Sequence, residues 1–167
     1  EKQIEEGRNF ATKLWNVARF VSSFEEPPAG KLLPSDEWIL AELNRVIESC
    51  RGAYDDLNLF IPSTRCRDFL WNLFAPHYVE MVKARAYEGD TGARWTLHAC
   101  LRDLLRLLAP IIPFSTDAIW RSAYGGSVHA ETFPRSRDGI PGSRADFTDA
   151  ILAFNADVPY DRFLLEH

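Results

Sequence analysis

The sequence lacks most features that would assign it to a class of enzyme or membrane protein. Its 167 residues include only three cysteines, no Cys-x-x-Cys pair, no Gly-rich phosphate loop, no Gly-x-Ser-x-Gly and no His-Glu-x-x-His. No apolar run approaches the roughly 20 residues that span a bilayer, and the polar start does not resemble a signal peptide. We therefore expect a cytoplasmic protein with reduced thiols, no membrane segment, no metal site and no catalytic residues in this stretch.

Positive charge is also scarce. The chain has 19 Lys and Arg against 24 Asp and Glu, a net charge of −5. Nonspecific coating of nucleic acid depends on neutralising phosphates, so this balance excludes it, although a local basic patch on an acidic domain remains compatible. With 46% hydrophobic and 26% charged residues, the composition is that of a globular domain with a real core.

Helical periodicity dominates the chain, and no segment shows the alternation typical of a β-strand. Ser35 or Asp36 is expected to cap the second helix, and Pro76 to kink the third helix or to remove one of its hydrogen bonds. We predict an all-α fold, an up-down bundle of four long helices plus a short fifth helix. The expected helices cover residues 3–22, 35–57, 63–87 and 93–109, with the fifth running from Ser115 or Thr116 to about Tyr124.

Short connections make consecutive helices antiparallel, so four helix ends should meet at one tip of the bundle. Basic and aromatic residues gather there from distant segments, which suits single-stranded RNA because bases stack on rings and cations hold phosphates. Ordinary solvated helix ends are the alternative, since Lys and Arg are favoured near helix C-termini. The residues concerned are Arg19, Phe20, Phe24, Lys83, Arg85, Tyr87, Glu88 and Arg94, with the 25–35 loop.

The opposite tip is more apolar than a free helix end requires. Two interpretations stay open: this tip is buried against a neighbouring domain, or it forms a local cap over the core of the bundle itself. The residues concerned are Phe60, Ile61, Ile111, Ile112, Phe114 and Trp120.

Five blocks of the sequence resemble one known family. Residues 7–20, GRNFATKLWNVARF, closely resemble the first helix of the anticodon-binding domain of valyl-tRNA synthetases. Four further blocks agree in the family's order: 36–43, 67–83, 104–120, and 127–134, the last similar to a strand-like tail.

These blocks differ in how specific they are. The segment Pro110–Phe114 is shared across class Ia synthetases, whereas the first block points to valine. Residues 83–87 and 151–155 are more similar to archaeal-type members than to bacterial ones. Ala109 stands where many relatives carry His, so no role is carried over to that position.

The resemblance implies that the domain grips the anticodon stem-loop of valine tRNA. In this family a catalytic domain of the same chain activates valine with ATP and Mg²⁺ and esterifies the tRNA. The full-length protein is then an ATP-dependent valine–tRNA ligase, but the His-x-Gly-His and Lys-Met-Ser-Lys-Ser signatures are absent here, so this stretch alone should be inactive and need no cofactor. We expect the tRNA contacts to be Arg19, Phe24, Lys83, Arg85 and Tyr87.

On this resemblance the chain divides into three parts. Residues 1–134 form the helical anticodon-binding domain, and 135–164 form a C-terminal extension with a short helix near 145–157. Residues 165–167 look like the remnant of a purification tag. The expected partners are valine tRNA and the catalytic domain of the same chain, and the expected oligomeric state is a monomer.

Several alternatives stay open at this point. Asn9, Lys13 and Asn16, on the polar side of the first helix, either touch the inner side of the tRNA or are simply solvated. The domain is alternatively the equivalent part of an isoleucyl or leucyl enzyme. A helical protein-interaction adapter without an RNA role is a third interpretation.

Overall fold

The structure, a computed structural model, describes residues 2–140 and confirms an all-α bundle in that part of the chain. The short helix expected near 145–157 and residues 165–167 lie outside the described residues. No helix within the described range is both long and apolar enough to cross a bilayer. The elements are α1 (Lys2–Val21), α2 (Pro34–Asp55), α3 (Phe60–Asp68), η1 (Phe69–Tyr78), α4 (Val79–Tyr87), α5 (Thr91–Leu108), α6 (Pro113–Ala123) and η2 (Val128–Ala130).

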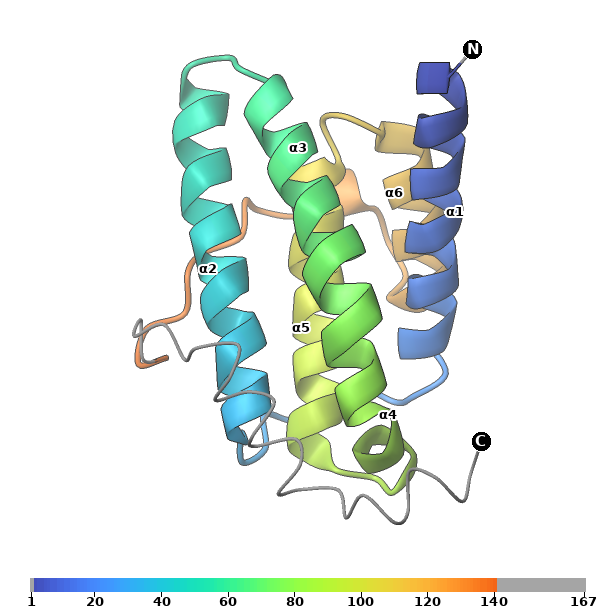
Figure 1. Cartoon of the computed structure of the whole chain (residues 1–167), viewed down its shortest axis with the longest axis vertical. Helices are drawn as coiled ribbons and strands as arrows, with labels where there is room; N and C mark the ends of the chain where they lie inside the picture. The colour runs from blue at the N-terminus through green and yellow to red at the C-terminus, as the bar shows by residue number, and fades with distance from the viewer. Residues whose placement is uncertain (1, 141–167) are drawn as a thin grey trace.

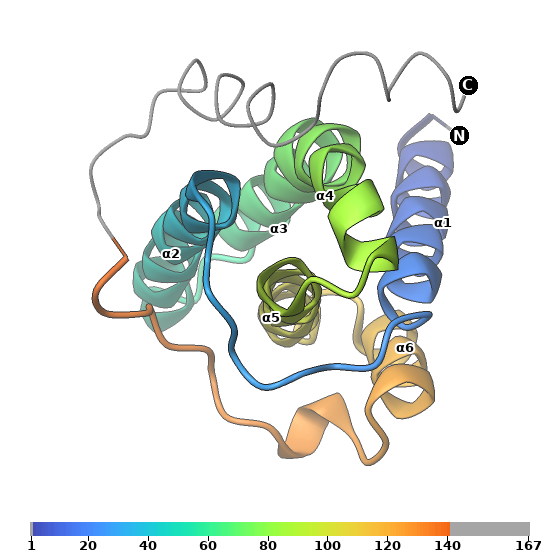
Figure 2. The same ribbon diagram turned by 90° about the horizontal axis from the view of Figure 1, so that it is seen from below.

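The helix α5 lies at the centre of the bundle. Viewed from below, α1, α2, α3 with α4, and α6 surround it (Figure 2). Its central position is seen in its burial, because most of its residues are buried, including the polar residues Thr96, His98 and Asp103. Among its fully buried side chains are Leu97, Cys100, Leu101, Leu104 and Leu105.

The three cysteines are free and buried, as predicted. Cys50 of α2 and Cys66 of α3 place their Sγ atoms 3.9 Å apart, and Cys100 lies in the centre of α5. Burial raises the pKa of the Cys100 thiol above its usual range, so this side chain stays protonated and packs as a small apolar group.

The predicted third helix is continuous in space but changes its winding. Residues 60–68 and 79–87 are α-helical, and the ten residues between them, Phe69–Tyr78, are π-helical. Pro76 explains the change, because it has no N–H to donate and its ring would collide with a carbonyl one α-helical turn earlier. The wider turn accommodates the ring without ending the helix. Figures 1 and 2 show that the helix runs on from α3 into α4, whose last part bends away from the axis of α3.

Two predicted helix starts were wrong by a few residues, for the same reason. The helix α2 starts at Pro34 with Leu33 as N-cap, and α6 starts at Pro113 with Ile112 as N-cap. Proline is preorganised for the first helical position, where its missing N–H costs nothing. Asp36 therefore lies in the first turn, where its Oδ2 accepts a hydrogen bond from the Leu33 N–H at 2.9 Å.

The segment after α6 forms no strand within the described residues, although residues 127–134 resemble a strand-like tail of the family. It contains the 3-10 turn η2, which starts where the Ser127 hydroxyl accepts a hydrogen bond from the His129 N–H. The chain then crosses α2, where the side chain of Asn44 exchanges two hydrogen bonds with the backbone of Arg137, at 2.9 and 3.0 Å. The guanidinium of Arg137 also pairs with buried Asp103 of α5 at 2.7 Å.

Candidate nucleic-acid interface

Four helix ends meet at one tip of the bundle, as the short connections predicted. We call this region the distal tip and define it as residues 19–33 and 83–94. In Figure 1 it lies at the bottom, where α1 and α4 end and α2 and α5 begin. The end of α1 and residues 83–87 lie at this same end of the molecule. The contact between the rings of Phe20 and Tyr87 joins them.

Three aromatic rings form the centre of the distal tip. The ring of Phe24 lies 5.2 Å from that of Phe20 and 5.2 Å from that of Tyr87, and Phe20 and Tyr87 are 6.2 Å apart, all with edge-on geometry. Phe24 is buried, whereas the side chain of Tyr87 is 65% exposed. Edge-to-face contacts stabilise aromatic pairs, so Phe20 and Phe24 hold the Tyr87 ring in place while most of Tyr87 stays exposed to solvent.

Two glycines let the loop between α1 and α2 lie directly on the start of α5. A Cβ atom on Gly92 would lie 2.2 Å from the carbonyl oxygen of Lys31, and one on Gly30 would lie 2.2 Å from Oγ1 of Thr91. Both distances are far shorter than any real contact, so glycine is required on each side. This close approach brings Phe24 and Tyr87, which are far apart in sequence, into contact.

His98 of α5 fixes the same loop from inside the bundle. Its Nε2 donates to the carbonyl oxygen of Phe24 at 2.9 Å, and its Nδ1 accepts from the hydroxyl of Tyr124 at 3.1 Å. Burial lowers the pKa of His98, an effect that the bond to the Phe24 carbonyl only partly opposes. His98 is therefore neutral near pH 7 and acts as a structural connection between α1, α5 and α6.

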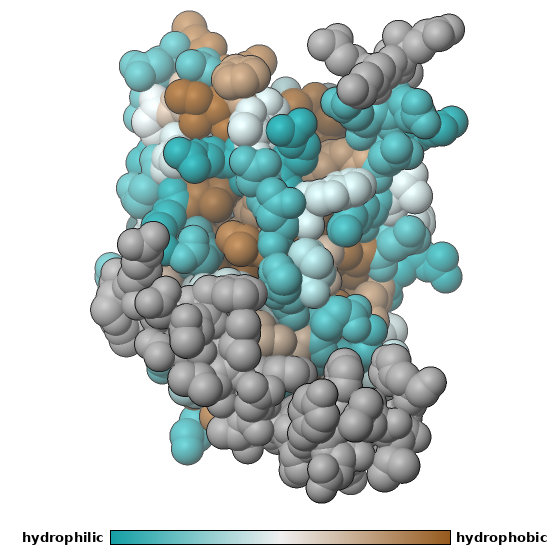
Figure 3. All heavy atoms as spheres, viewed as in Figure 1, coloured by the Kyte–Doolittle hydropathy of each residue, from teal (hydrophilic) through white to brown (hydrophobic). Residues whose placement is uncertain are grey.

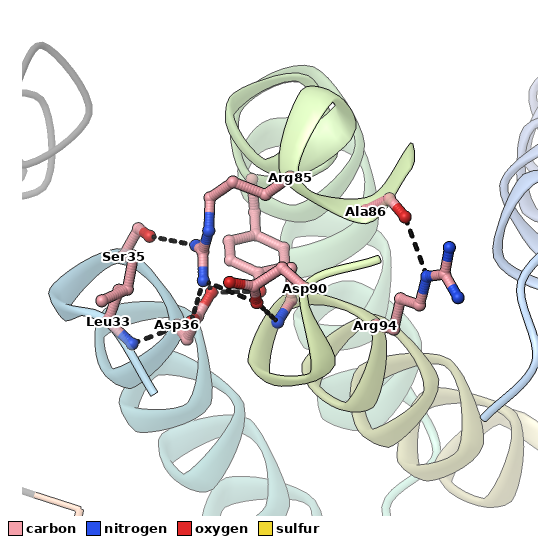
Figure 4. Close-up of polar contacts among 9 residues, drawn as sticks. Leu33, Ser35, Asp36, Arg85, Ala86, Asp90 and Arg94 are labelled. Atoms are coloured by element: carbon pink, nitrogen blue, oxygen red, sulfur yellow. Dashed lines mark hydrogen bonds and ion pairs between the residues drawn. The ribbon is translucent and has the colours of Figure 1, made fainter. Parts of the chain in front are cut away.

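A buried ion-pair network joins α2, α4 and α5 beneath the tip (Figure 4). The guanidinium of Arg85 contacts both carboxylate oxygens of Asp36, at 3.1 and 2.9 Å, and Oδ1 of Asp90 at 3.0 Å. The Tyr78 hydroxyl donates to Asp36 at 2.7 Å. The pKa of Tyr78 is raised well above its usual range, mainly by burial and also by the negative charge of Asp36. Asp90 also caps α5 by accepting from the Ala93 N–H at 2.7 Å. The network fixes the relative positions of three helix ends.

The five residues predicted to contact tRNA have different surroundings. Phe24, Lys83 and Tyr87 lie together, with Lys83 Nζ 6.0 Å from the Phe20 ring and bonded to Glu80. Arg19 is exposed at the same end, but it lines a separate hollow of about 190 Å³ between α1 and α6. Arg85 is only 8% exposed and is engaged by two carboxylates.

Arg94 was part of the predicted tip but not among the expected contacts. Its Nε donates to the Ala86 carbonyl at 2.8 Å, and its guanidinium lies over the Phe24 ring at 5.3 Å. In Figure 4 its two terminal nitrogens point away from that carbonyl. The signal in the sequence was its position in the first turn of α5, shortly after the Gly89 that follows α4.

A groove extends from the distal tip along α1. It has a volume of about 460 Å³ and separates α1 from η1 and α4. Asn9, Lys13 and Asn16 line one side, so the polar face of α1 borders a groove that reaches Phe20 and Lys83. Lys13 Nζ also lies 4.4 Å from the centre of the half-exposed Trp71 ring of η1, a cation–π contact between α1 and η1.

Comparison with known proteins gives a consistent assignment. Residues 36–157 match the family described as the anticodon-binding domain of tRNA ligase. The chain is similar to valine–tRNA ligases from Pyrobaculum aerophilum (45% identity over 140 residues) and Aeropyrum pernix (44% over 145), which cover 78% and 80% of this chain. It is also similar to the valine–tRNA ligase of Anaplasma marginale, at 37% identity over 95% of this chain.

The chain spans only 18% to 20% of the length of these three relatives. The family match nevertheless covers most of the chain and agrees with its helical fold. The chain therefore belongs to the family of anticodon-binding domains of tRNA ligases.

Proposed function

We propose that this chain recognises the anticodon stem-loop of valine tRNA as one domain of a valine–tRNA ligase. The family match supports anticodon binding, and the similarity to valine–tRNA ligases supports valine as the amino acid. The full-length ligase would use ATP and Mg²⁺ for aminoacylation. We assign this domain a binding role because its family match is to an anticodon-binding domain. Within residues 2–140 no group of three or more His, Cys, Asp or Glu is placed to hold a metal ion.

The observation that carries this proposal is the exposed ring of Tyr87, supported edge-on by buried Phe24. An unpaired base of the anticodon loop stacks on the exposed ring of Tyr87. Such stacking contributes about 1–3 kcal/mol per base and tolerates any base identity. Phe24 holds the ring in place from below and makes no direct contact with the RNA.

Cations around the ring provide the contacts to phosphates and base edges. Arg94 is held through Nε, so its terminal nitrogens remain available for a phosphate or for the edge of a stacked base. Lys83 reaches a phosphate beside Phe20 once it exchanges its exposed partner Glu80. Arg19 and Lys31, both exposed, extend the positive surface on either side.

Arg85 has a positioning role in this proposal. Its charge is neutralised by Asp36 and Asp90, and its burial leaves little surface for RNA. Through Asp90 it fixes the start of α5, and with it the backbone that carries Arg94. An Arg85→Ala variant would therefore weaken RNA binding through loss of structure, and its folding has to be measured alongside its affinity.

The groove along α1 accommodates the stem side of the RNA. Asn9, Asn16 and Lys13 offer amide and ammonium groups on one wall, at helical spacing. Amide side chains hydrogen-bond to phosphate and sugar oxygens without adding charge, which suits a domain whose net charge is negative.

The test is a fluorescence titration of the isolated anticodon stem-loop of valine tRNA with this chain. Tyr87→Ala should weaken binding by roughly 5- to 150-fold, the equivalent of one stacked base. Phe114→Ala, a control at the other end of the bundle, should leave the affinity unchanged. Unchanged affinity in Tyr87→Ala would remove Tyr87 from the interface.

The same titration distinguishes the remaining functions. A stem-loop carrying an isoleucine or leucine anticodon should bind more weakly than the valine one. Preference for either would assign the domain to that synthetase instead. Absence of salt-dependent binding to all three would contradict an RNA role and favour a protein-interaction adapter.

A further inference from the structure

Two buried cysteines from different helices face each other inside the bundle. Cys50 lies on α2 and Cys66 on α3, both are fully buried, and their Sγ atoms are 3.9 Å apart. The two helices lie side by side in both views (Figures 1 and 2). A disulfide bond is about 2 Å long, so the two sulfur atoms have to approach by about the same distance to form one. Rotation of a cysteine side chain moves its sulfur atom by a distance of this order.

The elements that carry these cysteines are also joined at the distal tip. Asp36, in the first turn of α2, pairs with Arg85 of α4, and α4 continues the helix that begins with α3. Cys50 and Cys66 therefore meet at a second point of contact between the same two elements, several helical turns away from the ion pair. A covalent bond between the two sulfur atoms would fix these elements to each other independently of the ion pair.

The two thiols are not equivalent. A hydrogen bond from Cys66 lowers the pKa of Cys50, and although burial opposes this effect, the positive charge of Arg65 adds to it. The same hydrogen bond, together with burial, raises the pKa of Cys66 well above its usual range. The thiolate is the reactive form of cysteine, so Cys50 reacts first while Cys66 is held beside it as a thiol.

The turn between α2 and α3 provides a path from solvent to these thiols. The helix α2 ends in a Schellman motif, in which the Leu57 N–H bonds to the Tyr54 carbonyl and the Asn58 N–H bonds to the Ala53 carbonyl. Leu57 is thereby held at a φ of 56°, which strains a residue that has a Cβ. Leu57 and Phe60 are 88% and 76% exposed, and Figure 3 shows hydrophobic residues at the surface over this turn. Opening of the turn therefore exposes little further apolar surface, which is typical of segments that open locally.

We propose that Cys50 and Cys66 form a redox-active pair, which a peroxide converts into a disulfide bond between α2 and α3. In the first step the Cys50 thiolate attacks one oxygen of hydrogen peroxide and the O–O bond breaks. Cys50 becomes a sulfenic acid, and the leaving hydroxide takes up the proton that Cys50 released and forms water. In the second step the Cys66 sulfur attacks the Cys50 sulfur, the S–O bond breaks, and the hydroxyl leaves with the Cys66 proton as a second water. The two thiols lose two electrons in total, and the peroxide accepts both.

The experiment exposes the reduced, folded chain to hydrogen peroxide, blocks the remaining thiols by alkylation and maps the peptides by mass spectrometry. Both cysteines lie in one continuous core within residues 2–140, so this chain is a suitable test protein. The intact mass should fall by two hydrogen atoms, with one linked peptide that contains Cys50 and Cys66, and dithiothreitol should reverse the change. Cys100 should remain a thiol, because it is fully buried and burial raises its pKa above the usual range.

Two variants separate the roles of the thiols. Cys66→Ala removes the thiol that completes the disulfide, so the sulfenic acid of Cys50 should persist and be captured by dimedone, a reagent for sulfenic acids. Cys100→Ala is the matched control, and it should form the Cys50–Cys66 link at the same rate as the wild type. The peptide map of the wild type depends on no variant, so a folding defect in Cys66→Ala leaves the test intact.

Thermal unfolding tests the connection between the two elements. Cys50 and Cys66 are 16 positions apart. Closing a loop of that size should raise the unfolding midpoint by roughly 5–15 °C. Asp36→Ala, which lacks the ion pair at the tip, should recover much of its lost midpoint on oxidation, whereas Asp36→Ala combined with Cys66→Ala should recover none.

Three results would overturn the proposal. The first is that peroxide leaves both thiols unreacted in the folded chain and links them only in urea. The second is that disulfides form between chains, seen as dimers on a nonreducing gel, and not within one chain. The third is that the oxidised chain unfolds at a lower temperature, which would show that the bond distorts the bundle. None of these measurements uses RNA, so failure of disulfide formation and failure of anticodon recognition are observed separately.

Discussion

A helix ends in the same backbone motif at each end of the bundle, but the residue in the left-handed position is glycine at one end and leucine at the other. At the distal tip α4 ends in a Schellman motif, with Gly89 at the left-handed position and a φ of 91°. At the opposite end of the bundle α2 ends in the same motif, with Leu57 at that position and a φ of 56°. Next to Gly89 the polar groups turn inward, to the network of Arg85 and Asp36. Next to Leu57 the apolar groups turn outward. At the distal tip the glycine avoids backbone strain, whereas Leu57 combines a left-handed φ with 88% exposure of its residue.

The largest expected effect comes from breaking the network under the tip. Asp36→Ala leaves the Arg85 guanidinium buried with one carboxylate partner and leaves the Tyr78 hydroxyl without its acceptor. Removing one partner of a buried ion pair costs about 3–5 kcal/mol of unfolding free energy. This loss is measured by urea denaturation, with circular dichroism as the readout of unfolding.

The matched control is a charge of the same sign on the surface. Glu80→Ala removes a carboxylate from an exposed pair with Lys83, and its effect should stay below about 1 kcal/mol. If Asp36→Ala were as mild as Glu80→Ala, the network would not be what fixes the three helix ends.

The second effect depends on pH and belongs to the distal tip. Burial lowers the pKa of His98 below its usual value of 6.5 in the folded state. Below pH 6.5 the unfolded chain therefore binds more protons than the folded chain, and the unfolding free energy falls as the pH falls. The loss reaches up to about 1.4 kcal/mol per pH unit and ends below the folded-state pKa.

This dependence is measured as the difference between the wild type and His98→Gln. Urea denaturation at several pH values below 6.5 should give a smaller slope for the variant, because carboxylates that titrate in the same range contribute equally to both proteins. Identical slopes would mean that His98 becomes protonated in the folded state without cost, contrary to its buried bonds to Phe24 and Tyr124.

The third effect tests the comparison of the two helix endings directly. Leu57→Gly should raise the unfolding free energy of this chain by about 1 kcal/mol, and Gly89→Leu should lower it by a similar amount. Space does not decide the second substitution, since a Cβ on Gly89 meets nothing closer than Arg94 at 4.0 Å. Thermal unfolding of the two variants should therefore shift in opposite directions. Shifts in the same direction would show that side-chain contacts, not φ, govern one of the sites.

Much of the fold could be predicted from the sequence because helical periodicity is a local signal. The helix spans, the antiparallel order and the end of α4 at Gly89 follow from spacing and from glycine chemistry. The helix starts at Pro34 and Pro113 lie earlier than the hydroxyl and carboxylate side chains predict, because proline at the first helical position is the stronger start signal here. The π-helical stretch around Pro76 was also missed, because whether proline kinks or widens a helix depends on how its neighbours pack.

The candidate interface was predicted less completely. Sequence spacing placed Tyr87, Lys83 and Phe24 at one tip, and the ring contacts agree with that placement. It could not reveal that Arg85 turns inward, because its partner Asp36 is 49 residues away in the sequence. A basic residue near a helix end has the same local pattern whether it binds RNA or a buried carboxylate.

The smallest expected effect on stability is that of Lys83, and its variants test whether this cation contacts the RNA. Lys83→Ala should change the unfolding free energy by less than about 0.5 kcal/mol, because its pair with Glu80 is exposed to solvent. In stem-loop titrations over a range of salt concentrations, the same variant should lower the slope of log K against log salt by about 0.7, the loss of one phosphate contact on a single strand. Glu80→Gln is the opposite test, since it frees Lys83 and should strengthen binding at low salt. If neither variant alters the slope, Lys83 lies outside the RNA path and Arg94 becomes the principal cation beside Tyr87.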